Sequence, residues 1–309
     1  MISFFAALAL YNTSLILWQN KSGALAAVLL YLLFIDISLW NAYVLTESLY
    51  TSFICFSVYC IARVYKGKGN YWFITLMMIT VLFTSLIKPT GIALVGALFS
   101  VFMYTLLKQL SNRIIYAGVV ILAGGTFLFL VNRMLTTYLI MENYQLGEVI
   151  YGVTTVNDHP EVKSLIISPP ENMYRPQVSY PPLLKIVLFF FHHPLYWFEL
   201  FFTKVGYLLT HLRPFWSWSH NLFSLIVLLP AYWFCVKALQ REKAKIQVVL
   251  FTVTYLSIHL CSVGITSEDW DGRFLIPMLP VIFLFAGYGM MGAFNEFRLK
   301  RMVNQSEAG

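Results

Sequence analysis

The stretch Met141–Pro182, MENYQLGEVIYGVTTVNDHPEVKSLIISPPENMYRPQVSYPP, is a long polar break in an otherwise apolar chain. An aromatic-rich run follows it over Leu183–His220, LLKIVLFFFHHPLYWFELFFTKVGYLLTHLRPFWSWSH. A long connection inside a compact protein is usually either functional or disordered. This one contains too many Tyr, Ile and Val residues for disorder. We therefore expect residues 136–219, called the cap segment below, to fold over one side of a membrane domain.

The composition around the cap segment is that of a membrane protein. The 309 residues are 59% hydrophobic and 11% charged, whereas soluble domains carry about 25% charged residues. The net charge of +7 does not indicate nucleic acid, because the basic residues lie at the ends of apolar segments, where membrane topology requires them. The four cysteines all fall inside apolar segments and have neither zinc nor disulfide spacing; they are Cys55, Cys60, Cys235 and Cys261.

The apolar segments have the length of membrane spans, since about 20 such residues cross the hydrocarbon core. The predicted spans are 2–18, 23–40, 43–65, 71–87, 90–107, 114–135, 220–237, 246–264 and 273–294. The sequence thus predicts an all-α polytopic membrane protein with about nine transmembrane helices, outer interfacial helices and one long extracytoplasmic loop. Its parts are the helices of 1–135, the loop of 136–219, the helices of 220–295 and a frayed cytoplasmic tail, 296–309.

The basic residues predict the orientation, because positively charged connections stay in the cytoplasm. They cluster at Lys21, Arg63–Lys68, Lys108–Arg113, Lys237–Lys245 and Arg298–Arg301. We therefore expect a multi-pass protein of a bacterial inner membrane with the cap segment outside. Residues 183–212 then make no net crossing. His192-His193-Pro194 breaks them into two amphipathic helices in the interface; a transmembrane hairpin is the alternative.

The same alternation of sides places Met1 outside. Polytopic bacterial proteins normally begin inside. We therefore expect that one helix and one loop precede this chain.

Ionisable residues at the predicted outer ends of the spans are the first candidates for a site, because charges near a membrane are costly unless they have a role. Glu47 lies about one turn into its helix and either orients a substrate or pairs with a base such as Lys88. Lys88 precedes Pro-Thr-Gly at a helix start, where anions are favoured. It suits a phosphate there; snorkelling to lipid headgroups is the alternative.

A second group opens the last span, SEDWDGRF over Ser267–Phe274. Arg273 offers a planar fork for a phosphate, and the three preceding carboxylates are alternative structural partners for it. Asp269 and Asp271 have the D-x-D spacing that could hold a divalent metal. No other spacing indicates a metal, and none indicates a cofactor.

The cap segment carries a third group of polar residues among many aromatics. His193, Lys204 and Arg213 are candidate contacts for an acceptor or a sugar, as are Glu47, Asp269 and Asp271 at the span ends. The neighbouring rings could stack on sugars. A structural role for the histidines and an interfacial aromatic belt are the plainer explanations.

Four motifs, in this order, carry a resemblance to a known group. They are TESLY at Thr46–Tyr50, KPTG at Lys88–Gly91, the pattern HP-x-x-W/F-x-x-L-x-x-x-K at His193–Lys204, and GRFLIPMLPVIFLFAGYG at Gly272–Gly289. From about residue 5 to 295 the chain resembles the GT-C superfamily of polytopic glycosyltransferases, the bacterial relatives of protein O-mannosyltransferases and lipid A aminoarabinose transferases.

The resemblance implies a membrane glycosyltransferase that takes a sugar from a polyprenyl-phosphate donor at the outer face, with inversion at C1. The acceptor is a lipid, a glycan or a protein. Lys88 and Arg273 would hold the donor phosphate. Family members carry their catalytic Asp in a first outer loop, whereas this chain begins at what resembles the family's second helix. The resemblance therefore leaves two alternatives open, an active glycosyltransferase and a truncated, inactive one. The catalytic residue stays unassigned; Asp36 and Glu47 are the nearest candidates.

Two other function classes remain open. A transporter or flippase of a lipid-linked saccharide would favour inverted repeats and polar groups at mid-bilayer, whereas here no repeat is seen and the charges gather at the outer face. A noncatalytic assembly partner of another membrane protein is the other class, and a partner protein fits it. Membrane lipids are expected partners in every case, and nucleic acid in none.

Overall fold

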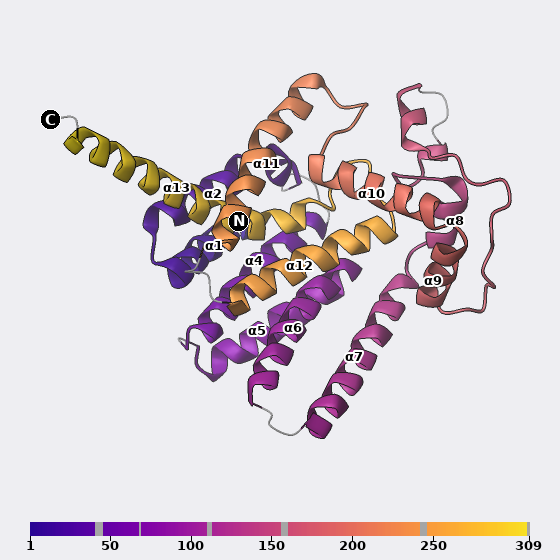
Figure 1. Cartoon of the computed structure of the whole chain (residues 1–309), viewed down its shortest axis with the longest axis horizontal. Helices are drawn as coiled ribbons and strands as arrows, with labels where there is room; N and C mark the ends of the chain where they lie inside the picture. Colours follow the sequence, from indigo (N-terminus) through magenta and orange to yellow (C-terminus); the bar gives the residue numbers. More distant parts are fainter. Residues whose placement is uncertain (41–45, 68, 110–112, 156–159, 242–245, 308–309) are drawn as a thin grey trace. The chain divides into compact units, whose positions relative to one another are not determined.

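The computed structural model describes residues 1–40, 46–67, 69–109, 113–155, 160–241 and 246–307. Over these residues its regular structure is helical, with two isolated β-bridges, Glu148–Ile166 and Ile150–Glu268 (Figure 1). The chain forms two compact units. Unit 1 comprises Met1–Ile87, Phe223–Val249 and Ile276–Gly309, and unit 2 comprises Lys88–Leu222 and Leu250–Leu275. These units interleave along the sequence, unlike the four consecutive parts expected from composition.

The chain is an all-α membrane protein, because six of the described helices are long and apolar enough to cross a membrane. These candidate spans are Thr46–Tyr65, Pro89–Gln109, Ile114–Leu135, Trp218–Leu239, Ile246–Ile265 and Ile276–Arg298. Three shorter apolar helices have 10–17 residues: Ile2–Trp18, Lys21–Leu33 and Tyr71–Ile87. Each predicted span overlaps one of these nine described helices, but only six of them are long enough to be candidate spans.

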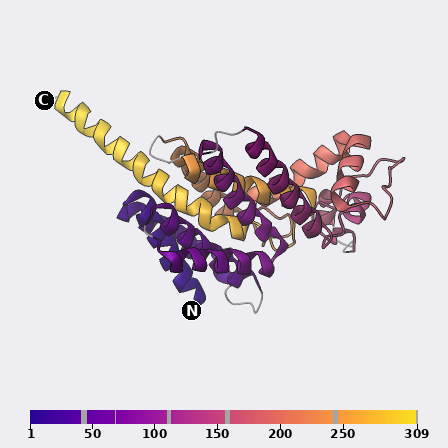
Figure 2. The same ribbon diagram turned by 90° about the horizontal axis from the view of Figure 1, so that it is seen from below.

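Unit 1 is built around its last helix. Its elements are α1 (Ile2–Trp18), α2 (Lys21–Leu33), α3 (Ile35–Trp40), α4 (Thr46–Tyr65), α5 (Tyr71–Ile87), most of α11 (Trp218–Leu239), η4 (Ile276–Met278) and α13 (Leu279–Glu307). The most apolar 18-residue stretch of the span Ile276–Arg298 is 78% buried inside the protein, which is the largest buried share among the six candidate spans. Figure 2 shows α13 as one continuous helix whose last turns extend past the other helices of this unit.

Small residues let α13 approach its neighbours closely. A Cβ atom at Gly287 would lie 2.4 Å from the carbonyl oxygen of Gly23 in α2, and one at Gly289 would lie 2.0 Å from the carbonyl oxygen of Phe234 in α11. Close helix pairs in membranes commonly use such small residues. The Trp18 ring stacks on Tyr288 at 4.6 Å between centroids, which fixes α1 against the same helix.

Unit 2 contains the cap segment. Its elements are η1 (Pro89–Gly91), α6 (Ile92–Gln109), α7 (Arg113–Leu135), α8 (Ile140–Leu146), η2 (Val153–Thr155), η3 (Pro160–Leu165), α9 (Pro182–His192), α10 (Pro194–Thr210) and most of α12 (Ile246–Ile265). The most apolar 18-residue stretch of α7 has no buried residue. Such an exposed apolar helix requires an apolar surrounding, which a membrane provides.

The cap segment is folded rather than disordered, as predicted. Tyr144 of α8, Phe189 of α9 and Leu200 of α10 are members of one buried cluster. Helices α9 and α10 meet at His193 and are bent by 116°, at the His-His-Pro break that the sequence indicates. Proline opens α10 because it needs no hydrogen-bond partner for a backbone N–H there.

Three sequence expectations differ from the structure. The span predicted at 23–40 is divided at Phe34, a buried residue that packs its ring near Phe223 and Phe283; tertiary packing overrides helix continuity there. The last helix begins at Leu279 instead of 273. Its tail is helical to Glu307 rather than frayed, because a run of good helix formers extends an existing helix without a new nucleation step. Lys68 and residues 242–245 of the basic connections lie outside the described residues.

Candidate functional site

The loop between α12 and η4, residues 266–275, is the meeting point of the polar groups in unit 2. Its first four residues, Thr266 to Asp269, are all less than 10% exposed. The cap segment pairs with it through the backbone: Glu268 N–H donates to the Val149 carbonyl at 3.2 Å, and Tyr151 N–H donates to the Glu268 carbonyl at 3.0 Å. These two backbone hydrogen bonds hold the loop against the cap segment.

Arg213 and Glu268 form a fully buried ion pair beneath this backbone contact. The Arg213 Nη2 donates to Glu268 Oε1 at 2.8 Å, and both side chains have 0% exposure. Arg213 also donates to the carbonyls of Asp269, Tyr207 and Leu212 at 2.9–3.0 Å. Burial raises the pKa of Glu268 to about 7, although the Arg213 charge acts to lower it. A carboxyl in this position changes charge near neutral pH.

Lys204 of α10 is the second fully buried cation. Its Nζ donates to the Thr266 carbonyl at 2.8 Å and lies 5.1 Å from the centre of the Tyr144 ring. The Tyr144 hydroxyl donates to the Ile265 carbonyl at 2.8 Å. The end of α12 is therefore fastened to α8 and α10 by a lysine and a tyrosine that both cap its last carbonyls.

Glu148 holds the neighbouring turn of the cap segment together. One carboxylate oxygen accepts from Gly152 N–H at 2.9 Å and the other from Thr154 N–H at 3.0 Å, and the residue is 2% exposed. Sequence reasoning missed this residue, because an acid that binds nearby backbone N–H groups has no distinctive spacing.

Asp269 and Arg273 are joined across one turn of the loop. The Arg273 Nε donates to Asp269 Oδ2 at 2.8 Å, and Nη2 donates to the same oxygen. Gly272 between them has φ +64°, and a Cβ there would lie 2.3 Å from the His211 ring. Only glycine fits this turn. Asp271 is exposed, while Asp269 is engaged by Arg273, so the two carboxylates of the D-x-D spacing have different surroundings.

Lys88 lies in the same unit and close to this loop. It is half-buried immediately before η1, and its charge interacts with His259 of α12. His259 is 0% exposed, and its Nε2 is 2.8 Å from the carbonyl oxygen of Phe274, the residue after Arg273. His259 thus lies within electrostatic range of Lys88 and within hydrogen-bond distance of the residue after Arg273. Sequence reasoning missed it because it lies inside an apolar span.

The other predicted residues have separate places. The His193 Nε2 accepts from Tyr174 N–H at 2.8 Å, which ties the loop before α9 to the bend. Asp36, in α3, is 4% exposed, and Glu47, in the first turn of α4, is 3% exposed. Both belong to unit 1, whereas Lys88 and Arg273 belong to unit 2.

Unit 2 also contains a cavity that the sequence did not indicate. It has a volume of about 330 Å³ and lies where α7 ends, α8 begins and α9 begins. Polar side chains on its wall include Tyr138, Glu142, Tyr180 and Lys185. The cavity is therefore an amphipathic opening in the cap segment.

Searches against protein-family models, characterised proteins and solved structures found no match to this chain.

Proposed function

We propose that this chain is a GT-C-type membrane glycosyltransferase, which uses a polyprenyl-phosphate sugar as donor. The observation that supports it best is that His259 lies within electrostatic range of Lys88 and 2.8 Å from the carbonyl oxygen of Phe274, the residue next to Arg273. Lys88 and Arg273 are far apart in the sequence and belong to the same unit. Both side chains are half-buried, a position in which a charge interacts with an anion more strongly than in bulk water.

The proposed chemistry is departure of the donor phosphate. As the bond between C1 of the sugar and the phosphate oxygen breaks, negative charge grows on that oxygen. Fixed cations stabilise this charge without reorganising. Lys88 and Arg273 would supply them, and the Asp269 carboxylate would fix the plane of the Arg273 guanidinium. The attacking acceptor hydroxyl must lose a proton, and the residue that accepts it stays unassigned.

Lys204 and Arg213 take a supporting role in this proposal. Their carbonyl and carboxylate partners belong to the 266–275 loop, so they would hold the loop that carries Arg273 rather than contact a sugar. The orientation, with the cap segment outside a bacterial inner membrane, is proposed from the basic connections.

The test is donor binding by the full chain in nanodiscs. We expect Lys88→Ala and Arg273→Ala each to weaken binding of a fluorescent polyprenyl-phosphate sugar by about tenfold, since hydrogen bonds to charged groups contribute roughly 1.5 kcal/mol or more. Lys88→Arg, which keeps the positive charge, should bind the donor more tightly than Lys88→Ala. Lys163→Ala, an exposed lysine of the same unit, is the matched control. If Lys88→Ala and Lys163→Ala bind the donor equally, the phosphate role is rejected.

A second readout separates a glycosyltransferase from the other classes. The glycosyltransferase proposal expects the donor to release its polyprenyl phosphate when an acceptor lipid or peptide extract is added. A transporter would move the intact donor between leaflets without releasing polyprenyl phosphate, and an assembly partner would do neither.

A further inference from the structure

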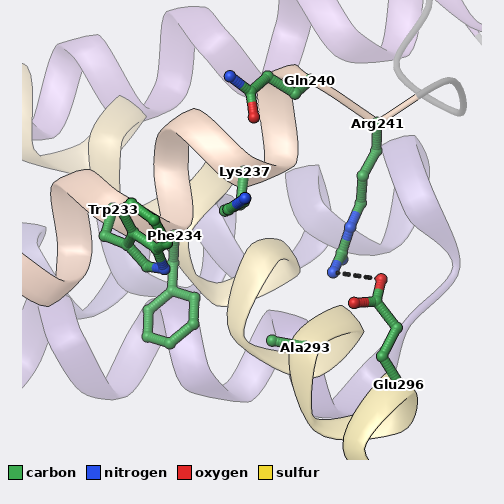
Figure 3. A pocket seen from close by; sticks show the side chains of 7 residues that line it. All are labelled: Trp233, Phe234, Lys237, Gln240, Arg241, Ala293 and Glu296. Carbon is green, nitrogen blue, oxygen red and sulfur yellow. Dashed lines mark hydrogen bonds and ion pairs between the residues drawn. The ribbon is translucent and has the colours of Figure 1, made fainter.

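A groove at one end of unit 1 has a different character from the proposed donor site. It has a volume of about 280 Å³ and lies between the last turns of α11 and the α13 helix (Figure 3). Its wall consists of Trp233, Phe234, Lys237, Gln240, Arg241, Ala293 and Glu296. Because α11 and α13 are both candidate membrane spans, the groove lies at the end of two such helices.

The two ends of the groove differ in polarity. Trp233 and Phe234 form an aromatic end, and Trp233 is 60% exposed. One turn further along α11, Lys237 lies on the same helix face as Trp233, because residues four apart share a face. Arg241 follows the end of α11 at Leu239 and lines the same groove. The Lys237 Nζ lies 4.9 Å from the centre of the Trp233 ring. An aromatic belt beside a cationic end is the arrangement of a membrane–water interface.

Arg241 is seated by the backbone of α13. A Cβ at Gly292 would lie 1.3 Å from its Nη1, so the guanidinium occupies the space that a side chain would fill. Its Nη2 is 3.2 Å from Glu296 Oε1, but that carboxylate is 69% exposed. An ion pair with so exposed a partner contributes little to stability. A phosphate in the groove, less hydrated than the exposed Glu296 carboxylate, can therefore compete with that carboxylate for the Arg241 guanidinium.

We propose that this groove binds the phosphate of an anionic phospholipid, with Lys237 and Arg241 on the phosphate and Trp233 and Phe234 along the glycerol and upper acyl chains. Basic pockets between membrane helices recognise such headgroups. The phospholipid is favoured over a free phosphate because two aromatic residues, Trp233 and Phe234, form one end of the groove wall. This site is independent of the proposed glycosyl transfer.

The test is lipid binding to the purified full chain by native mass spectrometry. Phosphatidylglycerol and phosphatidylcholine are added in separate titrations. We expect the wild type to prefer phosphatidylglycerol. Lys237→Gln and Arg241→Gln should each reduce that preference about fivefold, in line with roughly 1 kcal/mol for each basic residue near an anionic surface. Glu296→Gln should increase it, because it removes the carboxylate that competes for Arg241.

Three comparisons make the outcome decisive. Lys21→Gln, which removes an exposed lysine elsewhere in unit 1, should leave the preference unchanged. Gly292→Leu should abolish the Arg241 contribution and retain that of Lys237. Glycerol 3-phosphate at the same concentration should not displace the lipid. Equal competition by glycerol 3-phosphate, or an unchanged preference in the Lys237→Gln/Arg241→Gln double variant, would overturn the proposal.

Discussion

The sequence shows which residues of the cap segment are candidates for a polar site, but it does not show which partners they bind. Lys204 and Arg213 stand out in the sequence as charges in an aromatic run. Their partners lie 62 and 55 residues away, at Thr266 and Glu268, and no local spacing reveals such pairs. Glu268 itself was only one of three neighbouring acids. Its burial and its ion pair with Arg213 come from the way the loop folds against the cap segment.

The raised pKa of Glu268 predicts a pH-dependent stability. Its ordinary value is 4.5, and burial raises it to about 7 in the folded protein, where Arg213 and Asp269 are the charged groups facing it. Between these values the folded chain binds more protons than the unfolded chain, so the free energy of unfolding falls as pH rises. The contribution is complete below pH 4.5 and is lost as pH passes through 7.

We therefore expect the melting temperature in detergent to decrease between pH 5 and pH 8. Glu268→Gln, which imitates the protonated side chain, should flatten this dependence and melt near the wild-type value at pH 5. Asp271→Asn changes an exposed acid of the same loop and should keep the wild-type slope. A Glu268→Gln variant with that same slope would show that another group carries the effect.

Most helices could be predicted from the length of the apolar segments, but the residues at which they end or break could not. His192-His193-Pro194 indicated the bend between α9 and α10 because proline chemistry is local. Phe34 carries no such signal, and its break depends on rings from α11 and α13. In the sequence, Gly287-Tyr288-Gly289 is only part of a longer motif. In the structure, its two glycines allow close contacts of α13 with α2 and α11.

These contacts predict how substitution of Gly287 acts. A methyl group there would collide with the Gly23 carbonyl in α2, so Gly287→Ala should destabilise the chain by about 1–3 kcal/mol, the usual result of overpacking. Gly118→Ala in α7 is the control, because its Cβ would meet nothing within 4 Å. Thermal melting of both variants in one detergent measures the difference. Equal melting temperatures would mean that α2 and α13 are not closely packed at Gly287.

For the whole molecule, the membrane class was predictable because it depends on summed composition. It was harder to predict which helices cross the membrane, since α1, α2 and α5 have fewer than 18 residues. The division into two interleaved units was not foreseen, because it depends on contacts between segments distant in the chain. The order of sides around the membrane remains a prediction from basic residues.

That order is testable through α11. The cap segment ends at Ser219, and Lys237 lies at the other end of a single candidate span. Lys163→Cys and Lys237→Cys, each in a background without the four native cysteines, should therefore react from opposite sides with an impermeant maleimide. In intact bacterial cells only the first should be labelled; in inverted vesicles, only the second. Labelling of both from one side would reject the topology.

The backbone hydrogen bonds of Glu268 with Val149 and Tyr151 also set an order for biogenesis. A nascent chain releases Ser219, the end of the cap segment, 47 residues before Thr266 and 49 residues before Glu268. Until then, Lys204 and Arg213 lack the acceptors that they have in the finished protein. The cap segment can reach its mature form only after α12 has left the ribosome, so stalling translation just before that helix should yield a protease-sensitive intermediate.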